Sequence, residues 1–154
     1  MKEVPVTPDV LSNGGGVFRR ILVGYDGSAE AQHALRVGTA LAADLGGETH
    51  VLLVIRPGAH AETDDEREQA LFAERANLSK GLGALASESH HGWDVTTEAV
   101  YADDPAQAIA AYAEEHGFDL VVVGGHGREQ STHRGLGRSL EALLRHHPCP
   151  VLVV

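Results

Sequence analysis

The chain lacks the features that secreted, zinc-stabilised and membrane-spanning proteins need. It has one cysteine, Cys149, which excludes an intrachain disulfide, and no Cys/His spacing of a structural zinc site. No apolar run approaches the roughly 18–20 residues of a membrane-spanning helix. The first residues have neither the apolar core of a signal peptide nor the composition of a transit peptide. We therefore expect a protein of the cytoplasm that does not bind membranes.

Positive charge is also scarce. The 154 residues hold 12 Lys+Arg against 22 Asp+Glu, a formal net charge of −10. Proteins bind nucleic acids mainly by neutralising phosphates with Lys and Arg, so this balance argues against a nucleic-acid partner. A local site for a small anion remains compatible with it. The length and the apolar content of 43% are typical of one folded domain.

Apolar runs and helical patterns alternate along most of the chain. Residues 1–16, which are rich in proline and glycine, predict a flexible leader, and residues 17–154 predict a single domain. Apolar runs predict strands at 18–26, 49–55, 93–101, 119–125 and 150–154. Helical spacing and end signals predict helices at 28–46, 64–89, 105–116 and 137–147. The alternation indicates an α/β fold, a doubly wound parallel sheet with helices on both faces.

A glycine-rich segment follows the fourth predicted strand and leads into the last helix. Five of the 18 glycines fall within the fourteen residues from Gly124 to Gly137. In open α/β sheets, ligands bind beyond the carboxyl ends of strands where the strand order reverses. Glycines let the backbone approach an anion closely, and a helix amino terminus attracts phosphate. The same glycines also suit a long turn, so composition leaves both interpretations open.

The known phosphate-binding and catalytic motifs do not match this segment. It has no lysine, which excludes the Walker pattern GxxxxGK[ST], and Gln130 stands where GxGxxG needs its last glycine. No serine lies in a GxSxG elbow. Two pairs of adjacent histidines, at 90–91 and 146–147, could ligate a metal, but neither has a third ligand at a recognisable spacing. The sequence therefore predicts no catalytic residue and no metal site.

The order and spacing of the remaining motifs resemble the universal stress protein family. Its nucleotide-binding branch carries G-x2-G-x9-G-[ST], and Gly124, Gly127 and Gly137 stand at this spacing. The segment ILVGYDGS near the start of the domain and the segment RHHPCPVLVV at its end also resemble the family, so the resemblance covers residues 17–154. It implies a five-stranded parallel sheet in the order 3-2-1-4-5, with the ends of the first and fourth strands side by side.

The resemblance also implies the positions that would hold a nucleotide. Asp26 would lie near the ribose and a phosphate-bound metal, the backbone of Val54 would contact adenine, and Gly124, Gly127 and Gly137 would line the phosphates. The implied ligand is ATP or another adenine nucleotide, with Mg²⁺. The implied function is nucleotide-dependent regulation in the stress response, with at most weak ATP hydrolysis.

One position departs from the family motif. Arg138 stands where the family has Ser or Thr, and Ser139 follows it. A guanidinium that points inward would bind phosphate more strongly than a hydroxyl. If it points outward, Ser139 would replace the missing hydroxyl, or the site would lose the nucleotide. His126, between two motif glycines, is a further candidate phosphate donor. The alternative function is therefore a nucleotide-free, dimeric interaction module.

The last predicted strand, at 150–154, is apolar and carries no polar residue to block an edge. Such an edge usually finds a partner, and the family resemblance implies a homodimer through this strand. The stretch from Gly124 to Cys149 holds four arginines and two glutamates, so it is locally basic within an acidic chain. This distribution of charge suits a small anionic ligand.

Overall fold

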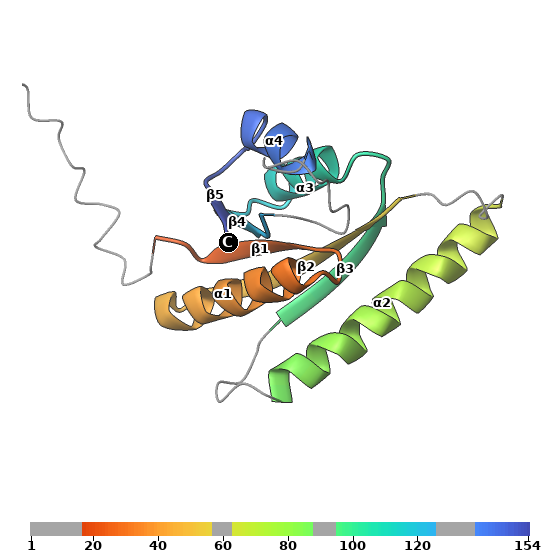
Figure 1. Cartoon of the computed structure of the whole chain (residues 1–154), viewed down its shortest axis with the longest axis horizontal. Coiled ribbons are helices and arrows are strands. Elements are labelled where there is room, and N and C mark those ends of the chain that lie inside the picture. Colours follow the sequence, from red (N-terminus) through yellow and green to blue (C-terminus); the bar gives the residue numbers. More distant parts are fainter. Residues whose placement is uncertain (1–16, 57–62, 88–94, 126–137) are drawn as a thin grey trace, which may run out of the picture.

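The computed structural model of the protein describes residues 17–56, 63–87, 95–125 and 138–154. In these residues five strands and four helices alternate along the chain (Figure 1). They are β1 (Arg20–Tyr25), α1 (Ala29–Leu45), β2 (Glu48–Ile55), α2 (Asp64–Ser87), β3 (Val95–Tyr101), α3 (Pro105–Glu115), β4 (Leu120–Val123), α4 (Arg138–Arg145) and β5 (Val151–Val153). The type and order of the predicted elements are confirmed, and their ends differ by at most two residues.

The strands form one parallel sheet in the order β3-β2-β1-β4-β5. β1 is central, because Ile21 pairs with Thr49 of β2 on one side and with Leu120 of β4 on the other. The chain adds β2 and β3 on one side of β1 and then crosses to add β4 and β5 on the other. The strand order implied by the family resemblance is therefore confirmed, and the switch point lies between β1 and β4.

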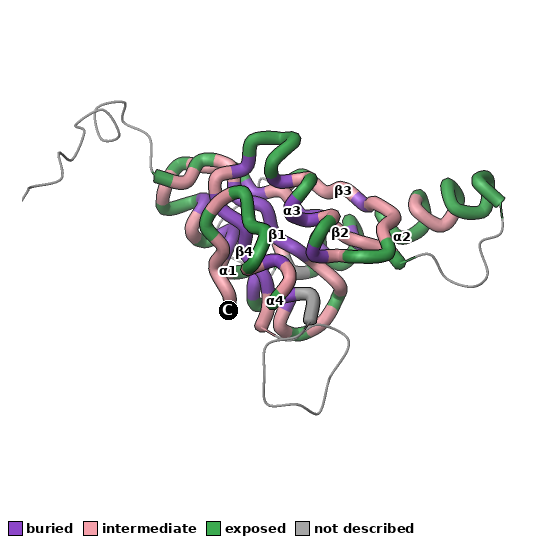
Figure 2. Tube along the Cα trace, turned by 90° about the horizontal axis from the view of Figure 1, so that it is seen from above, coloured by how far each residue is buried: buried purple, intermediate pink, exposed green. Residues whose placement is uncertain are grey.

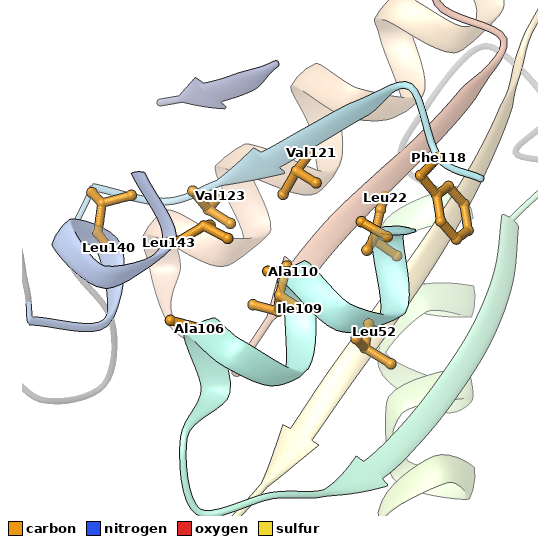
Figure 3. Close-up of a cluster of buried hydrophobic side chains, with 11 residues drawn as sticks. Leu22, Leu52, Ala106, Ile109, Ala110, Phe118, Val121, Val123, Leu140 and Leu143 are labelled. Atoms are coloured by element: carbon orange, nitrogen blue, oxygen red, sulfur yellow. The ribbon is translucent and has the colours of Figure 1, made fainter. Parts of the chain in front are cut away.

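Side chains of β1 alternate between two cores, one on each face of the sheet. Ile21 and Val23 belong to the core that α1 and α2 cover, whereas Leu22 belongs to the core beneath α3 and α4. Figure 3 shows the second core, in which Ile109 of α3 and Leu143 of α4 point toward the strands. Burying each side chain of this size contributes about 1.5–3 kcal/mol. The two cores hold the sheet rigid beneath the switch point.

Local signals in the sequence set the ends of α1 and α3. Ser28 is the N-cap of α1, and the helix ends at Gly46, which has φ +68°. Asp104 caps the amino end of α3, Pro105 fills its first position, and Gly117, just beyond its end, has φ +66°. Proline at the start and a left-handed glycine after the end are the usual signals of helix limits. These caps confirm the predicted limits and fix where each helix meets the sheet.

The second helix is the most exposed element of the described structure. Leu78 and Leu82 are its buried side chains, and most of the others lie in solvent (Figure 2). Its amino end projects beyond the sheet, and Phe72 is 76% exposed. None of the helices in the described residues has the length and apolar character that a membrane span requires.

Candidate functional site

The candidate site lies at the carboxyl ends of β1 and β4. Val23 of β1 pairs with Val122 of β4, so both strands reach the same edge of the sheet. β1 continues through residues 26–28 into α1, and β4 continues into the glycine-rich segment that precedes α4. Leu140 in the first turn of α4 packs in the same core as Val123, the last residue of β4 (Figure 3). The amino ends of both helices therefore lie close to this edge.

Asp26 and Ser28 form a tight turn between β1 and α1. The Asp26 carboxylate accepts a hydrogen bond from the Ser28 N–H at 2.9 Å, and Ser28 Oγ accepts one from the Ala31 N–H at 3.1 Å. Gly27 between them has φ +82°, a conformation that glycine adopts without strain. Two amide donors at the start of α1 are thus bonded to the chain's own side chains. The turn holds Asp26, half-buried, at the switch point.

The first motif glycine, Gly124, lies against the first turn of α1. A Cβ at Gly124 would meet Glu30 Cβ at 2.7 Å and the Glu30 carbonyl carbon at 2.9 Å, closer than side chains tolerate. At the neighbouring Gly125 a Cβ would meet Val153 Cγ1 at 3.7 Å, an ordinary contact. Gly124 therefore allows β4 and α1 to approach one another. The predicted contact of Gly124 with phosphate stays a prediction.

Val54 lies near the same edge of the sheet, on β2. It follows Leu53, which pairs with Tyr25 at the end of β1, and it pairs with Val100 of β3. Its side chain is half-buried against the core under α3 and α4. The fold thus brings the backbone of Val54 to the same end of the sheet as Asp26.

The other predicted site residues belong to the glycine-rich segment and the start of α4. Arg138 and Ser139 are the first two residues of α4. Their side chains lie outside the described structure, as do all of His126, Gly127 and Gly137. Their proposed contacts with phosphate stay predictions.

A second polar cluster lies at the opposite end of the sheet, where β1 and β2 begin. Arg20 Nε donates to Glu48 Oε1 at 2.9 Å, its guanidinium also donates to the His116 carbonyl, and its Cζ lies 4.8 Å from the centre of the Phe118 ring. The hydrogen bond from Arg20, followed by one from His50, lowers the pKa of the Glu48 carboxyl. These contacts join the end of α3 to the sheet, far from the switch point, and their role is structural.

Cys149 is a free, half-buried thiol at the edge of one core. It packs against the core under α3 and α4, and its burial, together with the negative charge of Asp119, raises its pKa. A raised pKa leaves little reactive thiolate at neutral pH. Among the described residues, no group of three or more His, Cys, Asp or Glu side chains is arranged to hold a metal ion.

Residues 18–154 match the model of the universal stress protein family. This chain belongs to that family. The match begins after residues 1–16, the predicted leader, which lie outside the described structure. The chain is 26% identical over 151 residues to a universal stress protein of Methanocaldococcus jannaschii, an alignment that covers 94% of this chain and 86% of the relative.

Solved structures of universal stress proteins share the fold. UspA from Lactobacillus plantarum has a TM-score of 0.73 and 25% identity, over 89% of this chain and 97% of that one. A universal stress protein in complex with cAMP has a TM-score of 0.65 and 21% identity, over 90% and 98% of the two chains. One from Archaeoglobus fulgidus in complex with dAMP has a TM-score of 0.57 and 18% identity, over 89% and 98%. At these lower identities the likeness concerns the fold alone.

Sequence reasoning missed Glu30 as a neighbour of the site. Glu30 and Gly124 are far apart in the chain, and their contact arises because α1 crosses the end of β4. The one signal was an acidic residue in the first turn of the helix that follows the first strand. That position is also typical of helices with no ligand, because an acid there complements the helix dipole.

Proposed function

We propose that this chain is a cytoplasmic stress-response protein that binds an adenine nucleotide at the switch point and acts as a nucleotide-dependent regulator. The main support for this proposal is the parallel strand order β2-β1-β4, because it brings Val54, Asp26 and Gly124 to one end of the sheet. These are positions that the nucleotide-binding members of the family use. Two family members have been solved with cAMP and dAMP, which share adenine, a sugar and a phosphate.

In this proposal the phosphates lie at the start of α4 rather than at the start of α1. The first turn of α1 already has Ser28 and Asp26 as acceptors for its amides. The start of α4 follows the motif glycines Gly127 and Gly137, and unbonded amides at a helix amino end attract phosphate. Arg138 adds a cation that can form two parallel hydrogen bonds with a phosphate.

The acidic side of the site suits a nucleotide that carries a cation. Asp26 would contact the ribose hydroxyls or a Mg²⁺ ion bound to the phosphates, because carboxylate oxygens are ligands that Mg²⁺ prefers. We therefore propose ATP with Mg²⁺ as the ligand. Ser139 and His126 would complete the phosphate contacts, and Val54 would contact adenine through its backbone.

The test is direct detection of bound nucleotide. Purified protein is denatured, the released small molecules are identified by mass spectrometry, and ATP with magnesium is then titrated by calorimetry. We expect adenine nucleotide in the extract or saturable binding in the titration. Gly127→Val should weaken that binding, while Gly83→Val, at an exposed position of α2 with nothing within 4 Å, should not. No binding by the wild type at millimolar ATP and magnesium would refute the proposal.

Arg138 decides between two forms of this site. If the guanidinium binds phosphate, Arg138→Ser should lower the affinity for ATP by about tenfold, the loss of one charge-assisted hydrogen bond. If it obstructs the site, the same change should raise the affinity, because it restores the family's hydroxyl.

A nucleotide-free dimer is the alternative function, and the exposed edge of β5 favours it. β5 is the last strand of the sheet, and Val151, Leu152 and Val153 are half-buried there. A second copy could cover this edge by pairing strand to strand about a two-fold axis. Sedimentation velocity at micromolar protein, with and without ATP, should show a dimer in both conditions. A monomer throughout would refute the proposed dimer.

A further inference from the structure

The sheet has two edge strands, β5 on one side and β3 on the other (Figure 1). β3 is the longer of the two, and its sequence VTTEAVY is uncharged except at Glu98. An edge strand presents backbone N–H and C=O groups that can pair with a strand of another chain. Natural proteins usually block such an edge, often with a charged side chain. The position of Glu98 therefore decides whether β3 is open to a partner.

The N–H of Ala99 points out of the sheet at this edge. Ala102, three residues further on, donates its N–H to the Ile55 carbonyl of β2 at 3.0 Å. The amides of successive residues in a strand point to alternate sides, so an amide three positions away points to the opposite side. The Ala99 N–H accordingly points away from β2, and it donates to Glu98 Oε1 at 3.4 Å. The Glu98 carboxylate thus covers one of the edge amides.

The Glu98 side chain leaves one face of the sheet, and its carboxylate meets a cation from the other face. Glu98 pairs with Leu52, whose side chain belongs to the core under α3 and α4, so both side chains lie on that face. Burial, and after it the negative charge of Glu98, raises the pKa of Tyr112 in α3, which agrees with this placement. Arg75 belongs to α2, which covers the opposite face, and its Nη1 lies 3.7 Å from Glu98 Oε1. The two side chains therefore meet across the free edge of β3.

The Arg75–Glu98 pair contributes little to stability, but its place opposes strand pairing. Its side chains are 54% and 41% exposed, and ion pairs in contact with solvent add little to the free energy of folding. A second copy could pair with β3 antiparallel, about a two-fold axis at the middle of the strand. The two Glu98 carboxylates would then face one another, and like charges directly opposite destabilise a strand pair. Glu98 thus occupies an edge amide and also repels its own copy.

We propose that Glu98, held by Arg75, is an autoinhibitory contact that closes the β3 edge to strand pairing with a second copy of this chain. Removal of the carboxylate frees the Ala99 N–H and leaves β3 without a charged side chain. β5 has no charged residue, so the contact leaves β5 as the edge that a partner can pair with. This inference goes beyond the proposed nucleotide site and does not depend on it.

The experiment compares the sedimentation of the full-length wild type, Glu98→Thr and Thr96→Val from micromolar to submillimolar concentration. At the higher concentrations the mass of Glu98→Thr should exceed that of the wild type by about twofold or more, because pairing at β3 joins two wild-type units. This ratio is expected whether the wild type is a monomer or a dimer. Thr96→Val is the matched control, since it makes an exposed position of β3 more apolar and keeps the Glu98 carboxylate. It should sediment as the wild type does.

Hydrogen exchange with mass spectrometry then locates the new contact. In associated Glu98→Thr, exchange should slow in residues 95–101 and stay as in the wild type in residues 151–153. Arg75→Gln, which leaves the carboxylate without its cation, should raise the mass by less than Glu98→Thr does. The melting temperature of monodisperse Glu98→Thr should lie within about 2 °C of the wild type, because the pair is exposed.

Three results would overturn the inference. The first is Glu98→Thr that melts as the wild type does and sediments as the wild type at every concentration. The second is association of Thr96→Val to the same extent, which would show that the apolar character of the strand decides pairing. The third is slowed exchange confined to residues outside β3. If Glu98→Thr does not fold, Glu98→Gln takes its place with the same expected gain in mass, because it keeps the shape of the side chain and removes the charge.

Discussion

Replacing Gly124 with alanine should destabilise the fold by about 1–3 kcal/mol, the usual cost of inserting a methyl group into a well-packed site. The added Cβ would lie 2.7 Å from Glu30 Cβ, 2.9 Å from the Glu30 carbonyl carbon and 3.1 Å from the carbonyl oxygen. Two of these three atoms are backbone atoms of the first turn of α1, so no rotation of a side chain relieves the contact. Either β4 or the start of α1 has to move.

Gly125→Ala provides the matched control one residue away. Its Cβ would be 3.7 Å from both Val153 Cγ1 and the Val154 carbonyl oxygen, and Gly125 is not among the glycines with positive φ. The substitution should leave stability unchanged or raise it by up to about 1 kcal/mol, because alanine restricts the unfolded chain. Both variants add the same methyl group at the end of the same strand.

Urea unfolding followed by circular dichroism measures the difference. We expect the Gly124→Ala midpoint to fall with an unchanged slope, and the melting temperature to drop by about 2–4 °C for each kcal/mol lost. Equal midpoints for the Gly124 and Gly125 variants would refute the reasoning, because they would show that α1 does not approach the end of β4 as closely as the structure has it.

Three other predictions concern the rest of the fold. Asp104→Ala should cost about 1 kcal/mol in urea unfolding, because the carboxylate accepts hydrogen bonds from the N–H groups of Ala106 and Gln107 at 3.0 and 3.2 Å. The raised pKa of the half-buried Cys149 thiol should make its reaction with an aromatic disulfide reagent at pH 8 slower in the folded protein than in urea; equal rates would contradict this effect of the fold. Arg20 lowers the pKa of Glu48 from its ordinary value of 4.5, so any stability advantage of the wild type over Glu48→Gln should be present at pH 7 and be lost as the pH falls below 4.5.

The fold was predictable because its signals are local and agree with one another. The continuous apolar run at the fourth strand could lie only where both faces of a sheet are covered, and all four residues of β4 are buried. Ser28, Gly46 and Pro105 marked helix ends through backbone chemistry that does not depend on the rest of the chain. The strand order, in contrast, came from the family resemblance, because the alternation of elements alone permits several orders.

The site was only partly predictable, since contacts between distant segments decide it. Asp26 and Gly124 were found through their motifs, and the parallel pairing of β1 with β4 places both at the switch point. The close contact of Gly124 with Glu30 depends on how α1 crosses the sheet, and no spacing in the sequence encodes that crossing. The Arg20–Glu48 pair was missed for the same reason, because sheet register brings these residues together.

The starts of α1 and α4, the two helices at the switch point, differ in charge and in the residues that precede them. At the start of α1, side chains of the chain itself bond the Ser28 and Ala31 amides, and Asp26 and Glu30 add negative charge. The start of α4 follows glycines and begins with Arg138, in a stretch from Gly124 to Cys149 that holds four arginines and two glutamates. The helix dipole favours an anion at the amino end of either helix, and the carboxylates of Asp26 and Glu30 oppose it at α1. In the proposed function, a ligand that carries both charges side by side, such as a metal-bound nucleotide, would suit both helices.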